Sequence, residues 1–190
     1  MQHSSKNCVY PTVEPKEEKE LVEACLRDER VAQKKLYDSF APMLMGVCCR
    51  YANSKEEGED ILIEGFTKIF DHLKEFHFES SLATWMRKIM LNTAISFFRM
   101  HHKHHNQLSL DDAFEQDWKQ EQSSPADKMM EQDLLRLVQR MPETYRVVFN
   151  LFVVEGLSHK EIGTTLGIQE STSRSQLVRA KNWLKERISQ

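Results

Sequence analysis

The sequence predicts an all-α protein made of two small helical domains joined by a flexible acidic linker, with a helix-turn-helix in the second domain. Glycine and proline, which interrupt helices, account for only 6 and 5 of the 190 residues. Apolar residues recur at steps of three and four, and no stretch alternates convincingly between apolar and polar residues as a strand does. A polar and acidic stretch without any period separates the two halves of the chain, which is typical of a linker.

The first domain is predicted over residues 16–103, after a flexible arm at residues 1–15. Pro11 and Pro15 discourage helix formation in that arm. The spacing of apolar residues predicts four helices in the domain, at residues 16–26, 29–52, 55–76 and 82–101 or a little beyond.

Side-chain caps mark the starts of two of these helices. Ser54 and Glu57 have the S-x-x-E spacing of a capping box, which satisfies free backbone N–H groups at a helix start. Ser80 or Ser81 stands directly before the fourth helix and can accept a hydrogen bond from its first turn. The aromatic and polar segment before this helix is therefore expected to be a loop.

The linker is predicted at residues 104–124 and the second domain at residues 125–190. One helix is expected to start at Pro125 and another at Pro142, because the first turn of a helix accepts proline. The helix that follows Pro142 is expected to end just before Gly156.

Residues 156–188 have the pattern of a helix-turn-helix. Ser158 and Glu161 form a second capping box, and Gly167 stands where a helix ends in a left-handed residue. The second helix is expected to open near Ser171.

This second helix has two different faces. An apolar stripe is formed by Leu177, Ala180, Leu184 and Ile188. Polar and basic residues lie opposite or beside the stripe, namely Thr172, Ser175, Arg179, Arg174, Gln176 and Lys181. Such a helix suits the major groove of DNA. The alternative is an ordinary helical hairpin with a solvated basic face.

Charge is segregated along the chain, whose net charge of −3 argues against a free-standing nucleic-acid binder. Residues 134–190 contain nine Lys and Arg against five acids, and residues 80–108 contain four Lys and Arg, four His and no acid. Residues 111–133 contain eight acids against two Lys. We expect this acidic segment to compete with nucleic-acid phosphate for the basic faces.

Signals for catalysis or cofactors are weak. No C-x-x-C pair occurs among the cysteines, so we expect reduced and mostly buried thiols in a cytoplasmic protein, at Cys8, Cys25, Cys48 and Cys49. A histidine cluster could bind a metal, but no carboxylate or cysteine completes a site at His101, His102, His104 and His105. We expect no metal, no cofactor, no enzymatic activity, no signal peptide and no membrane span.

Three ordered stretches narrow the choice of function. Residues 59–70 are EDILIEGFTKIF, residues 76–99 include ESSLATWMRKIMLNTAISFFR, and MPETYR at residues 141–146 leads into the helix-turn-helix. In this order they resemble the extracytoplasmic-function (ECF) sigma factors of bacterial RNA polymerase, over roughly residues 16–188. The resemblance implies a sigma factor that binds core RNA polymerase and directs promoter-specific initiation of transcription.

The resemblance also implies three binding surfaces. Contacts to core polymerase are implied for Glu59, Asp60, Ile61, Leu62, Glu64 and Phe66. Contacts to the melted minus-ten promoter element are implied for Phe78, Glu79, Ser80, Ser81, Arg87, Lys88, Asn92, Ser96, Arg99 and Lys103. Contacts to the minus-thirty-five element are implied for Ser171, Thr172, Arg174, Ser175, Gln176 and Arg179.

The sequence departs from the family pattern at five positions. Ile63 replaces a common Gln, Phe78 a common Gly, and Gln176 a frequent Arg. Val178 replaces a larger residue, and Ser173 stands on the apolar stripe where Val is usual. A buried hydroxyl at Ser173 is expected to need a backbone partner.

The resemblance implies promoter DNA and an anti-sigma factor as further partners. A conventional helix-turn-helix repressor or activator that acts without polymerase is the alternative. It would explain residues 156–188 but not residues 59–70 or 76–99. A metal-dependent helical hydrolase that uses the histidine cluster is a third candidate.

Overall fold

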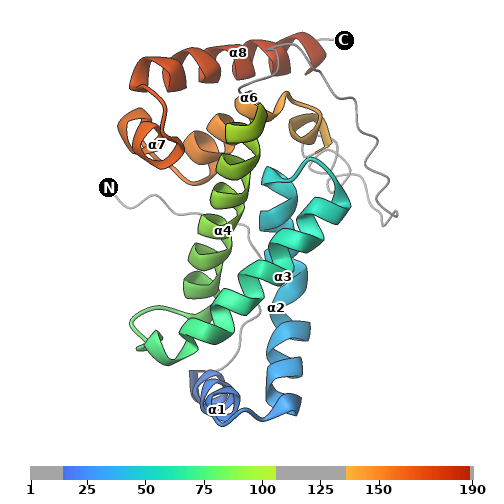
Figure 1. The fold of residues 1–190 in the computed structure, drawn as a ribbon, viewed down its shortest axis with the longest axis vertical. Coiled ribbons are helices and arrows are strands. Elements are labelled where there is room, and N and C mark those ends of the chain that lie inside the picture. Colours follow the sequence, from blue (N-terminus) through green and yellow to red (C-terminus); the bar gives the residue numbers. More distant parts are fainter. Residues whose placement is uncertain (1–14, 106–135, 189–190) are drawn as a thin grey trace.

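The computed structural model describes residues 15–105 and 136–188, and no strand occurs in these two ranges, which confirms the all-α class (Figure 1). The elements are α1 (Pro15–Leu26), α2 (Arg30–Tyr51), α3 (Lys55–His72), the 3₁₀ turn η1 (Leu73–Glu75), α4 (Leu82–His105), α6 (Glu143–Phe149), the π-helical η2 (Asn150–Val154), α7 (His159–Leu166) and α8 (Glu170–Ile188). Most of the predicted arm and linker, and the predicted helix start at Pro125, lie outside the described residues. At their edges the predicted bounds are wrong, because Pro15 begins α1 and α4 continues to His105.

The N-terminal domain is built on α2, α3 and α4, which pack against one another, with α1 across the N-terminal start of α2 (Figure 1). Apolar residues of α2 that recur at steps of three and four are buried, as are apolar residues of both partner helices. The interior includes Leu36, Phe40, Leu44, Val47, Ile61, Ile69, Met86 and Met90. Burial of these side chains is the main stabilising contribution to this domain.

The ends of the helices differ from the predicted ends by a few residues. Ser54 caps α3 by accepting a hydrogen bond from the Glu57 amide at 3.2 Å. The Glu57 carboxylate accepts its bond from the amide of Asn53, one residue earlier than a capping box requires. The helix ends at His72 rather than near Phe76, because its last turn tightens into η1.

The C-terminal domain consists of α6 with η2, α7 and α8, together with helical residues 136–139. One apolar cluster lies between residues 138–141 and α8 and contains Val138, Met141, Ala180 and Leu184. The prediction that Ile188 is buried is wrong, because this side chain is 64% exposed. It is the last residue of α8.

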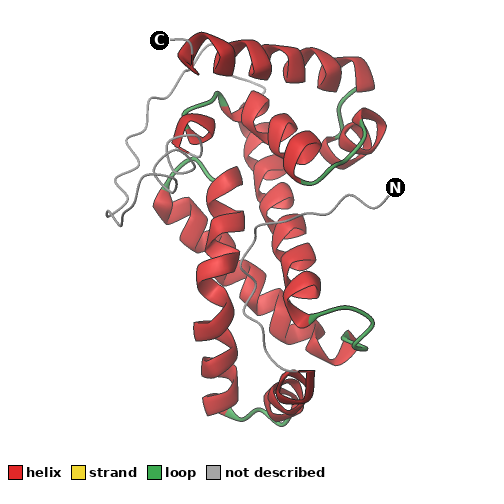
Figure 2. Cartoon of the chain, turned by 180° about the vertical axis from the view of Figure 1, so that it is seen from behind, coloured by secondary structure: helices red, strands yellow, loops and turns green. Residues whose placement is uncertain are grey.

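The two domains lie directly against each other, with α6 at the end of α2 and α7 beside α4 (Figure 2). Val147, Leu151 and Ile162 join the apolar cluster that also holds the N-terminal core. Among the described helices, none combines the length and the apolar character that a bilayer-spanning segment requires.

The packing of α3 on α4 generates a stability prediction at Gly65. A Cβ atom at this position would lie 2.3 Å from Sδ of Met90, which is fully buried. We expect Gly65→Ala to lower the free energy of unfolding by about 1–3 kcal/mol, since the buried Met90 side chain must leave its packed position to admit the methyl group. Urea unfolding monitored by circular dichroism measures the change.

The matched control is Gly46→Ala in α2, where an added Cβ meets nothing within 4 Å. This change is expected to raise the free energy of unfolding by about 0.5–1 kcal/mol, the helix propensity difference between the two residues. Equal effects at both positions would contradict the tight contact between α3 and α4.

Candidate nucleic-acid interface

The face of α3 that points to solvent is acidic with one apolar residue. Glu59 and Asp60 are exposed, and Glu64 is half-buried and pairs with Lys68 at 2.5 Å. Ile63 lies between them and is 61% exposed. The sequence prediction did not include Ile63, although the departure from the family pattern at this position was a signal for it.

The other three residues predicted for this surface lie in the core. Ile61, Leu62 and Phe66 are between 1% and 4% exposed. The ring of Phe66 packs against Tyr37 of α2, with centroids 4.6 Å apart. These side chains hold α3 in place and are not available for direct contact with a partner in this conformation.

A row of aromatic rings supports the loop before α4. Phe78 has a left-handed backbone with φ of 59° and is 44% exposed. Its ring lies 4.7 Å from the buried ring of Phe76, which lies 5.3 Å from Trp85. A bulky residue is costly in this backbone region, and such strain is concentrated at functional sites. The exposed ring of Phe78 gives this loop an aromatic face toward solvent.

Two hydrogen bonds fix the start of α4 beside this loop. Ser81 Oγ accepts a bond from the Thr84 amide at 3.3 Å, so the predicted serine cap is confirmed at the second of the two candidates. Glu18 of α1 accepts a bond from the Leu82 amide at 3.1 Å. Sequence patterns did not identify Glu18, because it lies 64 residues from its partner.

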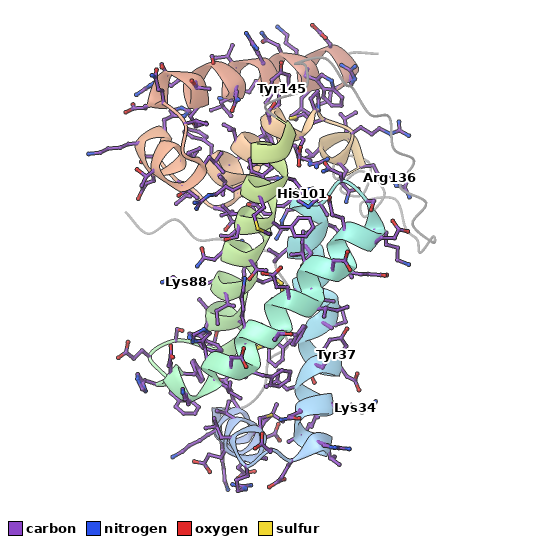
Figure 3. The ribbon with its side chains drawn as sticks, in the orientation of Figure 1. Lys34, Tyr37, Lys88, His101, Arg136 and Tyr145 are labelled. Carbon is purple, nitrogen blue, oxygen red and sulfur yellow. The ribbon has the colours of Figure 1, made fainter. Side chains whose placement is uncertain are left out.

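One face of α4 carries an exposed polar and basic stripe. Its members recur at steps of four and three, and they are Lys88, Asn92, Ser96 and Arg99. Lys88 extends outward from α4 on the side away from α3 (Figure 3). A stripe that begins beside an exposed aromatic loop has the composition of a surface for single-stranded nucleic acid, where bases stack and cations hold the backbone.

Arg87 differs from the other predicted residues of α4. Its Nη2 donates hydrogen bonds to both carboxylate oxygens of Glu155, at 2.8 and 2.7 Å. The side chain of Lys103 lies outside the described residues. His101 stacks on Phe97 with centroids 4.4 Å apart. Among the side chains that the structure describes, at residues 16–101 and 136–188, no group of three metal-ligating residues occurs.

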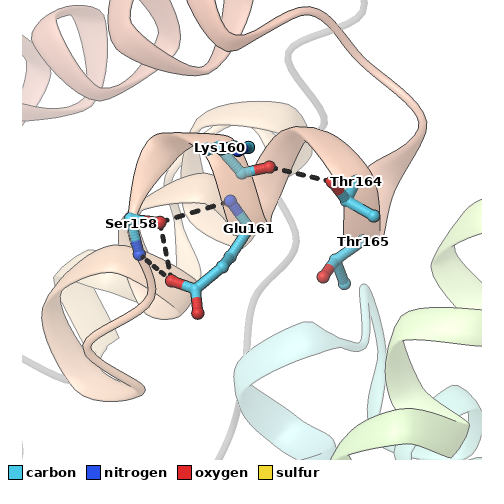
Figure 4. Close-up of a pocket in the computed structure, with 5 residues that line it drawn as sticks. All are labelled: Ser158, Lys160, Glu161, Thr164 and Thr165. Atoms are coloured by element: carbon cyan, nitrogen blue, oxygen red, sulfur yellow. Dashed lines mark hydrogen bonds between the residues drawn. The ribbon is translucent and has the colours of Figure 1, made fainter.

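The helix-turn-helix begins with the predicted capping box (Figure 4). Ser158 Oγ accepts a bond from the Glu161 amide at 3.3 Å, and Glu161 Oε2 accepts one from the Ser158 amide at 2.8 Å. Hydrogen bonds from the Ser158 side chain, then from its backbone, lower the pKa of Glu161. The box borders a shallow hollow that Lys160, Thr164 and Thr165 also line.

Two glycines allow the tight turn between α7 and α8. Gly167 has φ of 70°, which confirms the predicted left-handed helix end. A Cβ atom on Gly163 would lie 2.8 Å from the carbonyl oxygen of Ile168, so a larger residue would push the turn open.

Most of the predicted recognition residues on α8 are exposed. These are Ser171, Arg174, Ser175 and Arg179, whereas Thr172 and Gln176 are half-buried. Arg174 pairs with Glu170, and Ser175 Oγ donates to the Thr172 carbonyl at 2.9 Å. Val178 is 57% exposed beside them and adds an apolar contact of the kind that reads a thymine methyl group.

Ser173 is fully buried, but its partner is a side chain and not the expected backbone group. Its Oγ lies 3.0 Å from Nδ1 of His159 at the start of α7. The His159 ring stacks on Phe152, with centroids 4.7 Å apart. The hydroxyl on the apolar stripe thus joins both helices of the motif.

The thiols show the burial that the sequence predicted. Cys25 and Cys48 are buried, Cys49 is half-buried, and all three are free. Burial, followed by the neighbouring Cys49, raises the pKa of Cys48 to about 12. Cys8 lies outside the described residues.

Comparison with known families adds independent observations. Residues 36–104 match the family described as Sigma-70 region 2, and residues 131–184 match Sigma-70, region 4. The RNA polymerase sigma-H factor of Pseudomonas aeruginosa is 26% identical over 174 residues, which cover 87% of this chain and 90% of that protein. The ECF RNA polymerase sigma-E factor of Haemophilus influenzae is 25% identical over 177 residues, covering 88% and 93%.

A Bacillus subtilis protein, RNA polymerase sigma factor SigZ, is 28% identical over 151 residues, covering 80% of this chain and 84% of that protein. Among solved structures, the Bartonella quintana sigma factor RpoE in complex with the anti-sigma factor NepR aligns with a TM-score of 0.49 at 18% identity, covering 82% and 96% of the two chains.

The contact between His159 and Ser173 generates a prediction for the helix-turn-helix. We expect His159→Ala to destabilise the protein by about 1–3 kcal/mol, because it leaves a buried hydroxyl without a partner. In the background of Ser173→Ala the same change should cost about 1 kcal/mol less, since the hydroxyl is gone. A double-mutant cycle of urea unfolding measures this coupling, and additive effects would show that the two side chains are independent.

Proposed function

Because the chain belongs to the sigma-70 family as a sigma factor of the ECF type, we propose that its three exposed polar surfaces are its contacts with core polymerase and promoter DNA. The protein directs transcription initiation together with RNA polymerase. The proposal assigns residues of this chain to the contact with core polymerase and to the two contacts with promoter DNA.

The observation that carries the assignment is the exposed stripe of α4 beside the aromatic loop. In duplex DNA the base faces are stacked on one another, whereas the bases of separated strands are open to stacking on an exposed ring. Phe78 supplies the ring, and Lys88, Asn92 and Arg99 supply charge and hydrogen bonds along the strand. We assign this surface to the melted minus-ten element.

The acidic face of α3 is the proposed docking surface for core polymerase. Glu59 and Asp60 give it charge, and Ile63 gives it an exposed apolar centre. An apolar residue ringed by polar groups is the composition of a protein–protein contact.

The exposed residues of α8 are the proposed contacts to the minus-thirty-five element. Arg174 and Arg179 are suited to guanine or to phosphate, and Val178 to a thymine methyl group. The turn glycines and the capping box set the angle at which α8 enters the groove.

A conventional repressor would need the helix-turn-helix but not the N-terminal domain with its region 2 match. The hydrolase alternative depends on the histidine cluster at residues 101–105. It has no support from His101, the member of that cluster whose side chain the structure describes, since its ring packs on Phe97. A cytoplasmic location, an anti-sigma partner and the absence of covalent chemistry belong to this proposal.

The docking surface is tested by Asp60→Arg together with Ile63→Arg. Both side chains point to solvent, so we expect normal helix content but an affinity for core polymerase lowered about tenfold or more. The affinity is measured by competition with the native protein for core polymerase, and the effect on function by in vitro transcription.

Its control is the pair Glu20→Arg and Val31→Arg, an acid and an exposed aliphatic residue on α1 and α2. If the α3 variant competes for core polymerase as well as this control variant does, α3 is not part of the docking surface.

The aromatic loop is tested by comparing Phe78→Ala with Phe78→Gly. Both remove the ring, and both should weaken binding of holoenzyme to a pre-melted promoter by about 1–3 kcal/mol. Only glycine relieves the left-handed backbone, so the Gly variant should be about 1 kcal/mol more stable than the Ala variant. Filter binding and urea unfolding measure the two effects, and unchanged strand binding by both variants would refute the stacking role.

A further inference from the structure

Helix α1 lies against the loop that joins α3 to α4. In both views of the ribbon it lies at the end of the N-terminal domain where this loop turns back (Figure 1 and Figure 2). It packs on η1, directly before the loop. Leu21, Val22 and Cys25 of α1 are buried in the N-terminal core and hold the helix in this place. A polar side chain of α1 that reaches the loop therefore starts from a fixed position.

Glu18 of α1 completes the start of α4. Its Oε1 accepts a hydrogen bond at 3.1 Å from the amide of Leu82, the first residue of α4, which is fully buried. The first N–H groups of a helix have no acceptor within it, and a buried one without a partner is costly. Ser81 serves the next donors, since its Oγ accepts from the Thr84 amide and its carbonyl from the Trp85 amide. The acceptor for Leu82 comes from α1 instead.

The exposed aromatic ring lies between these two anchored ends. Residues 76–81 separate η1 from α4, with Phe76 buried at one end and Leu82 buried directly after the other. Phe78 lies within this short segment and has the left-handed φ of 59°. A strained backbone of this kind persists only where its surroundings enforce it. Fixing the Leu82 amide limits the directions in which the Phe78 ring can point.

We propose that Glu18 is a positioning residue for recognition of the minus-ten element. By holding the Leu82 amide, it keeps the aromatic loop in the conformation in which Phe78 faces the unpaired strand. Glu18 acts through the loop and does not contact DNA itself. If the loop adopts the binding conformation for only part of the time, the apparent affinity for the strand falls by that fraction. This inference rests on the proposed assignment of the loop and α4 to the melted strand.

The test compares three variants in holoenzyme bound to a pre-melted promoter. Glu18→Ala removes the acceptor and should weaken binding about tenfold, which corresponds to about one loop in ten in the binding conformation. Glu18→Gln keeps a carbonyl oxygen that can accept from the Leu82 amide, so it should restore native affinity. Glu17→Ala removes an exposed acid from the same turn of α1 and should also bind as the native protein does.

A duplex fragment that carries only the minus-thirty-five element separates positioning from a general folding defect. The proposed contacts to this element are on α8, in the other domain, so all three variants should bind the fragment as the native holoenzyme does. A loss for Glu18→Ala that is equal on both DNAs would give Glu18 a general structural role and overturn the inference.

The route through the loop is tested in the background of Phe78→Ala. There Glu18→Ala should cause no further loss of strand binding, because the ring that Glu18 positions is absent. An undiminished loss in that background would overturn the inference. If Phe78→Ala weakens strand binding and Glu18→Ala does not, the proposed function stands and the positioning role fails. If Phe78→Ala alone binds the pre-melted promoter normally, the stacking function fails, and the positioning role fails with it.

Discussion

The buried face of α4 is the constraint on which the other features of the molecule depend. Met86, Met90 and Ala94 are fully buried at steps of four residues, and Gly65 lets α3 approach the Met90 side chain closely. Once this face is fixed in the core, the remaining faces follow from helix geometry. The stripe that begins at Lys88 points to solvent. Arg87, one residue earlier, faces the second domain.

Polar groups rather than apolar area set the finer arrangement. Glu18 and Ser81 hold the start of α4, and Ser158 with Glu161 holds the start of α7. Each bond satisfies a backbone N–H that the helix leaves free, and so fixes the direction in which the chain enters it. The aromatic loop lies next to the fixed start of α4, and α8 follows α7 across the tight turn at Gly167.

Local patterns in the sequence were sufficient for the helices and for the turn of the helix-turn-helix. Apolar spacing, the three serines that cap helices and Gly167 all act within a few residues, so they are visible without a structure. The contacts that the sequence did not show are distant along the chain. Glu155 lies 68 residues from Arg87, and Ser173 meets His159 across the turn. The prediction for α3 also did not separate exposed residues from core residues, since it included Ile61, which is buried, and not Ile63, which is exposed.

The central claim is that α4 holds the unpaired promoter strand while α8 holds duplex DNA upstream. A photo-cross-linking amino acid at position 92 tests it in holoenzyme bound to a promoter, beside probes at positions 175 and 35. The account predicts that position 92 cross-links to the melted minus-ten segment, that position 175 cross-links to duplex near minus thirty-five, and that position 35 cross-links to neither. Cross-links from position 92 to duplex alone, or none at all while position 175 still contacts DNA, would contradict it.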